Sequence, residues 1–121
     1  MPEKITVLYI DDEIINLELF KCLFSDKYNV ISGCCGLFGL ESLESNPDIR
    51  VVISDMRMPE MSGLEFIAKA RKHYIDKKYI LLTGYDLSDE IREALDSNLI
   101  DNFFNKPFKV GDIEDAINNA E

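Results

Sequence analysis

Polar side chains that could do chemistry stand at the ends of four apolar segments of this chain. Asp11 and Asp12 follow the first segment, Asp55 the third, Thr83 the fourth and Lys106 the fifth. Crowded carboxylates repel one another and raise each other's pKa unless a cation neutralises them. Oxygen ligands without neighbouring His or Cys favour a hard ion, so the aspartates predict a Mg²⁺ (or Mn²⁺) site.

Asp55 is the predicted nucleophile of this group. A carboxylate held beside Mg²⁺ can attack a phosphorus atom and form an acyl phosphate. The transferring group spreads negative charge over its oxygens, so a fixed ammonium and a hydroxyl donor lower the barrier electrostatically. Lys106 and Thr83 supply these two groups, and the predicted chemistry is phosphoryl transfer onto Asp55.

The elements that must position these residues follow from an alternation of strand-length apolar runs with helix-period segments. The predicted strands lie near Lys4–Ile10, Tyr28–Ser32, Ile49–Ser54, Lys78–Leu82 and Asp101–Asn105. Continuously apolar strands suit a parallel sheet covered by helices on both faces, which predicts an α/β, doubly wound (βα)₅ sandwich. Ligands of such sheets bind beyond the carboxyl ends of the strands, where the polar residues converge.

Helices are expected between and after the strands. Apolar spacing gives the first, third and last helix one face each, formed by Ile15, Leu19 and Leu23, by Leu64, Ile67 and Ala68, and by Ile113, Ala116, Ile117 and Ala120. Segments 36–46 and 88–98 carry weaker helix patterns. Ser62 and Glu65 have capping-box spacing and mark the start of the third helix.

Four motifs occur in order, each at the end of a predicted strand. They are Asp11-Asp12-Glu13, Ser54-Asp55-Met56-Arg57-Met58-Pro59-Glu60-Met61-Ser62-Gly63, Leu82-Thr83-Gly84-Tyr85 and Asn105-Lys106-Pro107-Phe108. Together they resemble the receiver domains of two-component response regulators, a chemotaxis-regulator-like family. The resemblance spans nearly the whole chain and implies one receiver domain, residues 1–121, with a flavodoxin-like five-stranded parallel sheet in the order 2-1-3-4-5.

The resemblance also implies a metal site. Asp12 and Asp55 would bind Mg²⁺ through their side chains, and Arg57 would bind it through its backbone carbonyl. Asp11 would act mainly through water. Arg57 and Tyr85 flank the site, and our hypothesis is that these bulky side chains shield the acyl phosphate from water and so lengthen its lifetime.

The remaining roles concern the phosphoryl group and the switch. By the resemblance, Lys106 would pair with the phosphoryl oxygens, Thr83 would hydrogen-bond them, and the backbone amides of Met56 and Gly84 would add donors. Receivers switch when this Thr hydroxyl moves toward the phosphate and an aromatic side chain moves inward behind it. Phe103 occupies that aromatic position, and because it lacks a hydroxyl, packing must carry the signal.

Partners follow from the same resemblance. A sensor histidine kinase or a phosphotransfer protein would donate the phosphoryl group in a phosphorelay. Phosphorylation would remodel the face formed by the fourth helix, the fifth strand and the fifth helix, which would bind a downstream effector or a second copy of the chain. The domain would be a signalling phosphoacceptor rather than a conventional enzyme, catalysing only its own phosphorylation and autodephosphorylation.

Composition limits the number of domains, the classes of partner and the location of the protein. A chain of 121 residues fits one domain, and its net charge of −10 opposes direct binding to nucleic acid or anionic lipid. No apolar run is long enough to span a membrane, and the N-terminus lacks a signal-peptide pattern, which predicts a cytoplasmic protein. The three cysteines lack metal-ligand spacing and receive no role, and neither does His73.

Three other functions are compatible with parts of this pattern. A receiver-like adaptor would bind partners without phosphate, but the complete set of Asp55, Thr83 and Lys106 counts against it. A metal-dependent phosphohydrolase would need a second acid two residues after the nucleophile, where Arg57 stands. A flavin-binding protein of similar topology is the third, although a fold alone does not carry function.

Overall fold

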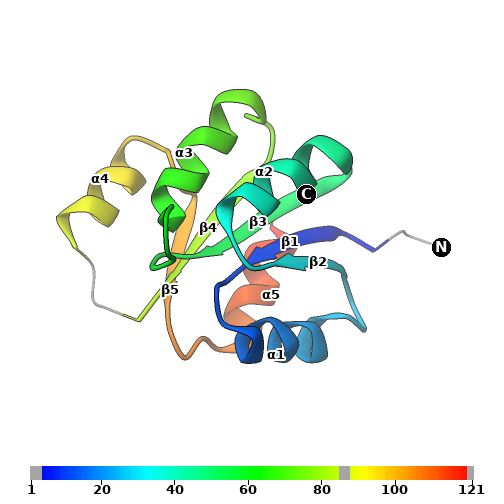
Figure 1. The fold of residues 1–121 in the computed structure, drawn as a ribbon. Helices are drawn as coiled ribbons and strands as arrows, with labels where there is room; N and C mark the ends of the chain where they lie inside the picture. The colour runs from blue at the N-terminus through cyan, green and yellow to red at the C-terminus, as the bar shows by residue number, and fades with distance from the viewer. Residues whose placement is uncertain (1–3, 85–87, 120–121) are drawn as a thin grey trace.

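The structure is a computed structural model that describes residues 4–84 and 88–119. Over these residues, strands and helices alternate along the chain (Figure 1). The elements are β1 (Thr6–Ile10), α1 (Ile14–Phe24), β2 (Asn29–Gly33), α2 (Gly36–Ser45), β3 (Ile49–Asp55), α3 (Gly63–His73), β4 (Lys78–Thr83), α4 (Asp89–Asp96), β5 (Asn102–Asn105) and α5 (Val110–Asn118). The predicted βα alternation is confirmed.

The strands form one parallel sheet in the order β2-β1-β3-β4-β5, as predicted. Because β1 lies between β2 and β3, the order of the strands reverses at the β1/β3 pair. Ligands bind at this reversal in open parallel sheets, beyond the carboxyl ends of the strands. Asp11 follows β1 and Asp55 ends β3, so the sheet topology alone brings these two carboxylates to one place.

Two helical layers cover the sheet. Helices α1 and α5 lie on one face, and α2, α3 and α4 lie on the other (Figure 1). Consecutive strand residues face opposite layers, so in β3 Val51 and Ile53 join the core under α1 and α5, whereas Val52 joins the core under α2, α3 and α4. All three side chains are fully buried, which fixes the register of β3 and therefore the place of Asp55 at its end.

The loop after β3 ends at a well-defined helix start. The Ser62 hydroxyl accepts a hydrogen bond from the Glu65 amide at 3.2 Å, and the Ser62 amide donates to the Glu65 carboxylate at 3.2 Å. This is the predicted capping box, which satisfies two amides at the start of α3. The Gly63 amide also donates to the Met56 carbonyl at 2.8 Å, which closes the loop that follows Asp55.

The predicted inner face of α1 is wrong. Ile15, Leu19 and Leu23 are 78%, 51% and 41% exposed, whereas Phe20 and Phe24 are buried. The helix carries two apolar stripes at four-residue spacing. The aromatic stripe, Phe20 and Phe24, faces inward because its rings pack in one core cluster with residues of the sheet and of α5. The prediction held for α3, where Leu64 and Ile67 are buried and Ala68 is half-buried.

In α5, the predicted inner residues Ile113 and Ile117 are buried and Ala116 is half-buried, whereas Ala120 lies outside the described residues.

A membrane span would require a long, continuously apolar helix, and no helix among residues 4–84 and 88–119 has that length and composition.

Candidate functional site

Three carboxylates meet at the carboxyl edge of the sheet. Asp11, Asp12 and Asp55 each offer an oxygen atom, and these atoms lie within 4.8 Å of one another. Asp11 is fully buried and Asp55 is 7% exposed, whereas Asp12 faces solvent. An all-oxygen set of acidic ligands open to water on one side fits a hard divalent cation such as Mg²⁺, which keeps several of its waters when it binds.

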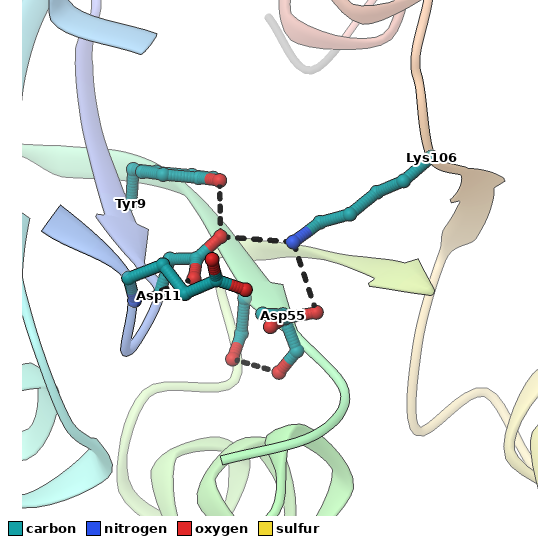
Figure 2. A network of polar contacts seen from close by, with 6 residues as sticks. Tyr9, Asp11, Asp55 and Lys106 are labelled. Atoms are coloured by element: carbon teal, nitrogen blue, oxygen red, sulfur yellow. Dashed lines mark hydrogen bonds and ion pairs between the residues drawn. The ribbon is translucent and has the colours of Figure 1, made fainter. Parts of the chain in front are cut away.

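Lys106 brings a positive charge to the same place from the end of β5. Its Nζ lies 2.9 Å from Oδ2 of Asp11 and 3.2 Å from Oδ1 of Asp55 (Figure 2). The ammonium group therefore bridges the acidic residue after β1 and the acidic residue that ends β3. Both ion pairs are largely removed from bulk water, so their geometry matters more than that of surface pairs.

Asp11 holds two further hydrogen bonds. The Tyr9 hydroxyl donates to Oδ2 at 2.7 Å, and the Glu13 amide donates to Oδ1 at 3.0 Å. The sequence indicates only that Tyr9 belongs to the apolar strand predicted near Lys4–Ile10, and does not reveal this contact. Residues two apart along a strand point to the same side, so a polar-tipped Tyr two positions before Asp11 was a usable signal.

The site shifts the pKa of its groups in opposed ways. Burial raises the pKa of Asp55 above its usual range, the charges of Asp11 and Asp12 add to this, and Lys106 partly offsets it. Burial alone would lower the pKa of Lys106, but its bonds to Asp11 and Asp55 outweigh burial and leave the pKa raised. Burial and the Asp11 carboxylate raise the pKa of Tyr9 strongly, so its hydroxyl stays a donor.

Thr83 and Gly84 lie where the sequence predicted them, at the end of β4. Thr83 is buried, and its carbonyl accepts a hydrogen bond from the Lys106 amide at 2.7 Å, which ties the end of β4 to the residue after β5. Gly84 is exposed, and an added Cβ there would meet no atom within 4 Å.

The backbone amide of Met56, a predicted phosphoryl donor, already has an acceptor. Its amide donates to the Leu82 carbonyl at 2.8 Å, so this N–H is already engaged between β3 and β4. A role for this amide as a phosphoryl donor would require that bond to open.

Arg57 is exposed, and together with Asp12 it lines an open cavity of about 490 Å³ beside the carboxylates. Tyr85, the other predicted flanking residue, lies outside the described residues.

Phe103 and Phe104 point to opposite faces of β5. Phe103 packs against the core under α2, α3 and α4, and Phe104 packs against the core under α1 and α5. Both rings are half-buried. Phe103 thus lies partly inserted on the α4 side of the sheet, which is compatible with inward and outward positions of its ring.

Comparison with known proteins assigns the chain to a family. Residues 7–118 match the family described as the response regulator receiver domain, and the chain belongs to this family. Its members act in two-component signalling and accept a phosphoryl group on an aspartate. A crystal structure of a response regulator receiver domain protein from Clostridium thermocellum matches with a TM-score of 0.88 and 32% identity, covering 95% of this chain and 92% of that one.

Curated relatives show the same domain alone and inside longer proteins. Sporulation initiation phosphotransferase F of Bacillus subtilis is 29% identical over 119 residues, which are 97% of this chain and 92% of that protein. The hydrogenase transcriptional regulatory protein HoxA of Bradyrhizobium diazoefficiens is 25% identical over 116 residues, and the chain spans only 24% of its length. The chain likewise spans 11% of the sensor kinase CckA of Brucella abortus.

Proposed function

We propose that this receiver domain takes a phosphoryl group from a phosphohistidine of a sensor kinase or phosphotransfer protein onto Asp55, in a Mg²⁺-dependent reaction. The observation that carries the proposal is the position of the Asp55 carboxylate. It ends β3, lies 3.2 Å from the Lys106 ammonium, and shares its edge of the sheet with the carboxylates of Asp11 and Asp12. Asp11 also contacts the Lys106 ammonium, but it is fully buried and its two oxygens accept hydrogen bonds from Tyr9 and Glu13, whereas Asp55 is 7% exposed.

The proposed reaction is a displacement at phosphorus. A carboxylate oxygen of Asp55 forms the new O–P bond, the P–N bond of the phosphohistidine breaks, and its electron pair returns to the imidazole ring. Lys106 and the Thr83 hydroxyl stabilise the charge on the phosphoryl oxygens, and the Gly84 amide is a further donor. Hydrolysis of the acyl phosphate by water returns Asp55 to its starting state.

A divalent ion would be held by the side chains of Asp12 and Asp55, by the backbone carbonyl of Arg57, and by Asp11 through water. When bound, it neutralises the carboxylates and the transferring oxygens and so lowers the barrier to attack. The chain's own contribution is to present Asp55 in its charged form. Burial raises the pKa of Asp55, and the Lys106 ammonium works against that rise before the donor binds.

The conformational change caused by phosphorylation of Asp55 would pass through Thr83 and Phe103 to the face formed by α4, β5 and α5. Movement of the Thr83 hydroxyl toward the phosphoryl group would vacate space that the half-buried Phe103 ring fills. The remodelled face would bind a downstream effector or a second copy of the chain. The exchange is proposed to take place in the cytoplasm without direct nucleic-acid contact, in line with the net charge of −10.

The proposal is tested by incubating the domain with Mg²⁺ and acetyl phosphate and following the intact mass. We expect one labile phosphoryl adduct in the wild type, none without Mg²⁺, and none in D55N. D48N is the matched control, because Asp48 is an exposed aspartate outside the carboxylate cluster. Failure of the wild type to label would refute the proposal, and turnover of the donor without an adduct would indicate a phosphohydrolase instead.

The lifetime hypothesis has its own test. Arg57 lines the cavity beside Asp12, where it would limit the approach of water to the acyl phosphate. The half-life of phosphorylated protein should be shorter in the R57A/Y85A double variant than in the wild type. Equal half-lives would contradict the hypothesis that Arg57 and Tyr85 shield the acyl phosphate from water.

A further inference from the structure

One buried tyrosine of the carboxylate network has no part in the reaction as proposed above. The Tyr9 hydroxyl donates to Oδ2 of Asp11 at 2.7 Å, and the same oxygen accepts the Lys106 ammonium at 2.9 Å (Figure 2). Tyr9 and Lys106 therefore share one carboxylate oxygen, which accepts both hydrogen bonds. Lys106 in turn is shared between Asp11 and Asp55.

The requirement for Lys106 to move makes this sharing important. In the proposed reaction, its ammonium stabilises phosphoryl oxygens on Asp55, which draws it away from Asp11. Asp11 is fully buried, and a buried carboxylate that loses a donor is strongly destabilised. Without Tyr9, Asp11 would keep only the Glu13 amide among its described donors once Lys106 moved away.

The Tyr9 ring is fixed in place. It is 1% exposed and stacks on Phe20 with 4.1 Å between ring centroids and 4° between ring planes. Phe20 in turn contacts Phe24 and Phe108. The hydroxyl therefore stays on Asp11 when Lys106 moves, because the ring cannot swing after it.

We propose that Tyr9 is a positioning residue of the phosphorylation reaction, which keeps Asp11 hydrogen-bonded and so releases Lys106 toward the phosphoryl group. This inference rests on the proposed function. In Y9F, Asp11 would hold Lys106 more tightly, and the ammonium would be less available to the transferring oxygens. The maximal rate of Asp55 phosphorylation should fall about tenfold, the size expected for one hydrogen bond to a charged group.

The matched control is Y79F. Tyr79 is also a fully buried strand tyrosine, and its hydroxyl donates to the Tyr74 carbonyl at 2.7 Å, in the core on the other face of the sheet. Both variants remove one buried hydroxyl of equal size. Y79F therefore shows how far the loss of a buried tyrosine hydroxyl by itself slows the reaction, whereas release of Lys106 concerns Tyr9 only.

The experiment measures the initial rate of phosphorylation by acetyl phosphate as a function of Mg²⁺ for the wild type, Y9F and Y79F. We expect Y9F to lose about tenfold in maximal rate, with the half-saturating Mg²⁺ concentration changed by less than about threefold, and Y79F to stay within about twofold of the wild type. A Y9F rate equal to the wild type, an equal loss in Y79F, or a loss caused by weaker Mg²⁺ binding would each overturn the inference.

A double-variant comparison links the effect to the ammonium group. In the K106M background there is no ammonium to release, so adding Y9F should cause little further loss of rate. The same tenfold loss in both backgrounds would contradict the inference. If the wild type itself is not labelled at Asp55, the proposed function fails and this inference fails with it; if it is labelled and Y9F behaves like the wild type, only the inference fails.

Discussion

Gly63 offers a sharp test of how the fold holds Asp55 in place. It is the first residue of α3, and a Cβ added there would lie 2.2 Å from the Asp55 carbonyl oxygen and 2.9 Å from Cδ1 of Leu81. The nearest atom belongs to the backbone of a central strand, so it cannot rotate away as a side chain would. In G63A, the start of α3 and the end of β3 must therefore separate by roughly 1 Å.

The cost of this separation can be bounded. Overpacking of a tight interior contact typically destabilises a protein by about 1–3 kcal/mol, and the better helix propensity of Ala offsets only part of it. We expect G63A to lose about 2 kcal/mol of unfolding free energy. For a chain of 121 residues, this corresponds to a fall in Tm of about 8 °C.

The assay is urea and thermal unfolding followed by circular dichroism, with G111A as the matched control. Gly111 lies in the first turn of α5, and a Cβ there would meet nothing within 4 Å, so G111A should gain about 0.5–1 kcal/mol. Labelling of Asp55 by acetyl phosphate should slow in G63A and not in G111A. A G63A variant as stable as the wild type would refute the account of this contact.

Three further predictions concern α1, the capping box and the charge on Asp55. F20A should cost about 3–5 kcal/mol in urea unfolding and I15S less than about 0.5 kcal/mol, and equal losses would contradict the assigned inner face of α1. S62A should cost about 1 kcal/mol because the Glu65 amide loses its acceptor, and an unchanged urea midpoint would argue against the cap. Because the folded pKa of Asp55 is raised, stability should fall as pH rises through that pKa, so D55N should be more stable than the wild type near pH 7. This difference should disappear below about pH 4, where both side chains are neutral, and a difference independent of pH would exclude charge as its cause.

The sequence was sufficient to predict the sheet and the cluster at its edge. Continuously apolar strands require helices on both faces, and this parallel arrangement sends every carboxyl end to the same edge. Asp11, Asp55 and Lys106 are therefore close in space although Lys106 is 95 residues from Asp11. The capping box was also predictable, because its two hydrogen bonds depend on residues only three positions apart.

The orientation of α1 and the role of Tyr9 were harder to predict for a common reason. Helix α1 offers two apolar stripes, and the stripe containing Phe20 turns inward because its ring stacks on Tyr9 of β1. Periodicity within one helix cannot reveal which stripe a partner strand will contact. The same contact fixes the Tyr9 hydroxyl on Asp11, so both features depend on one interaction between separate elements.

The most direct test of the central claim is to locate the phosphoryl group on the chain. Protein labelled with acetyl phosphate and Mg²⁺ would be reduced with borohydride, which converts an aspartyl phosphate to homoserine, then digested and sequenced by mass spectrometry. We expect conversion of Asp55, with Asp11 and Asp12 unchanged. Conversion of another aspartate, or a label that survives on a different residue type, would contradict it.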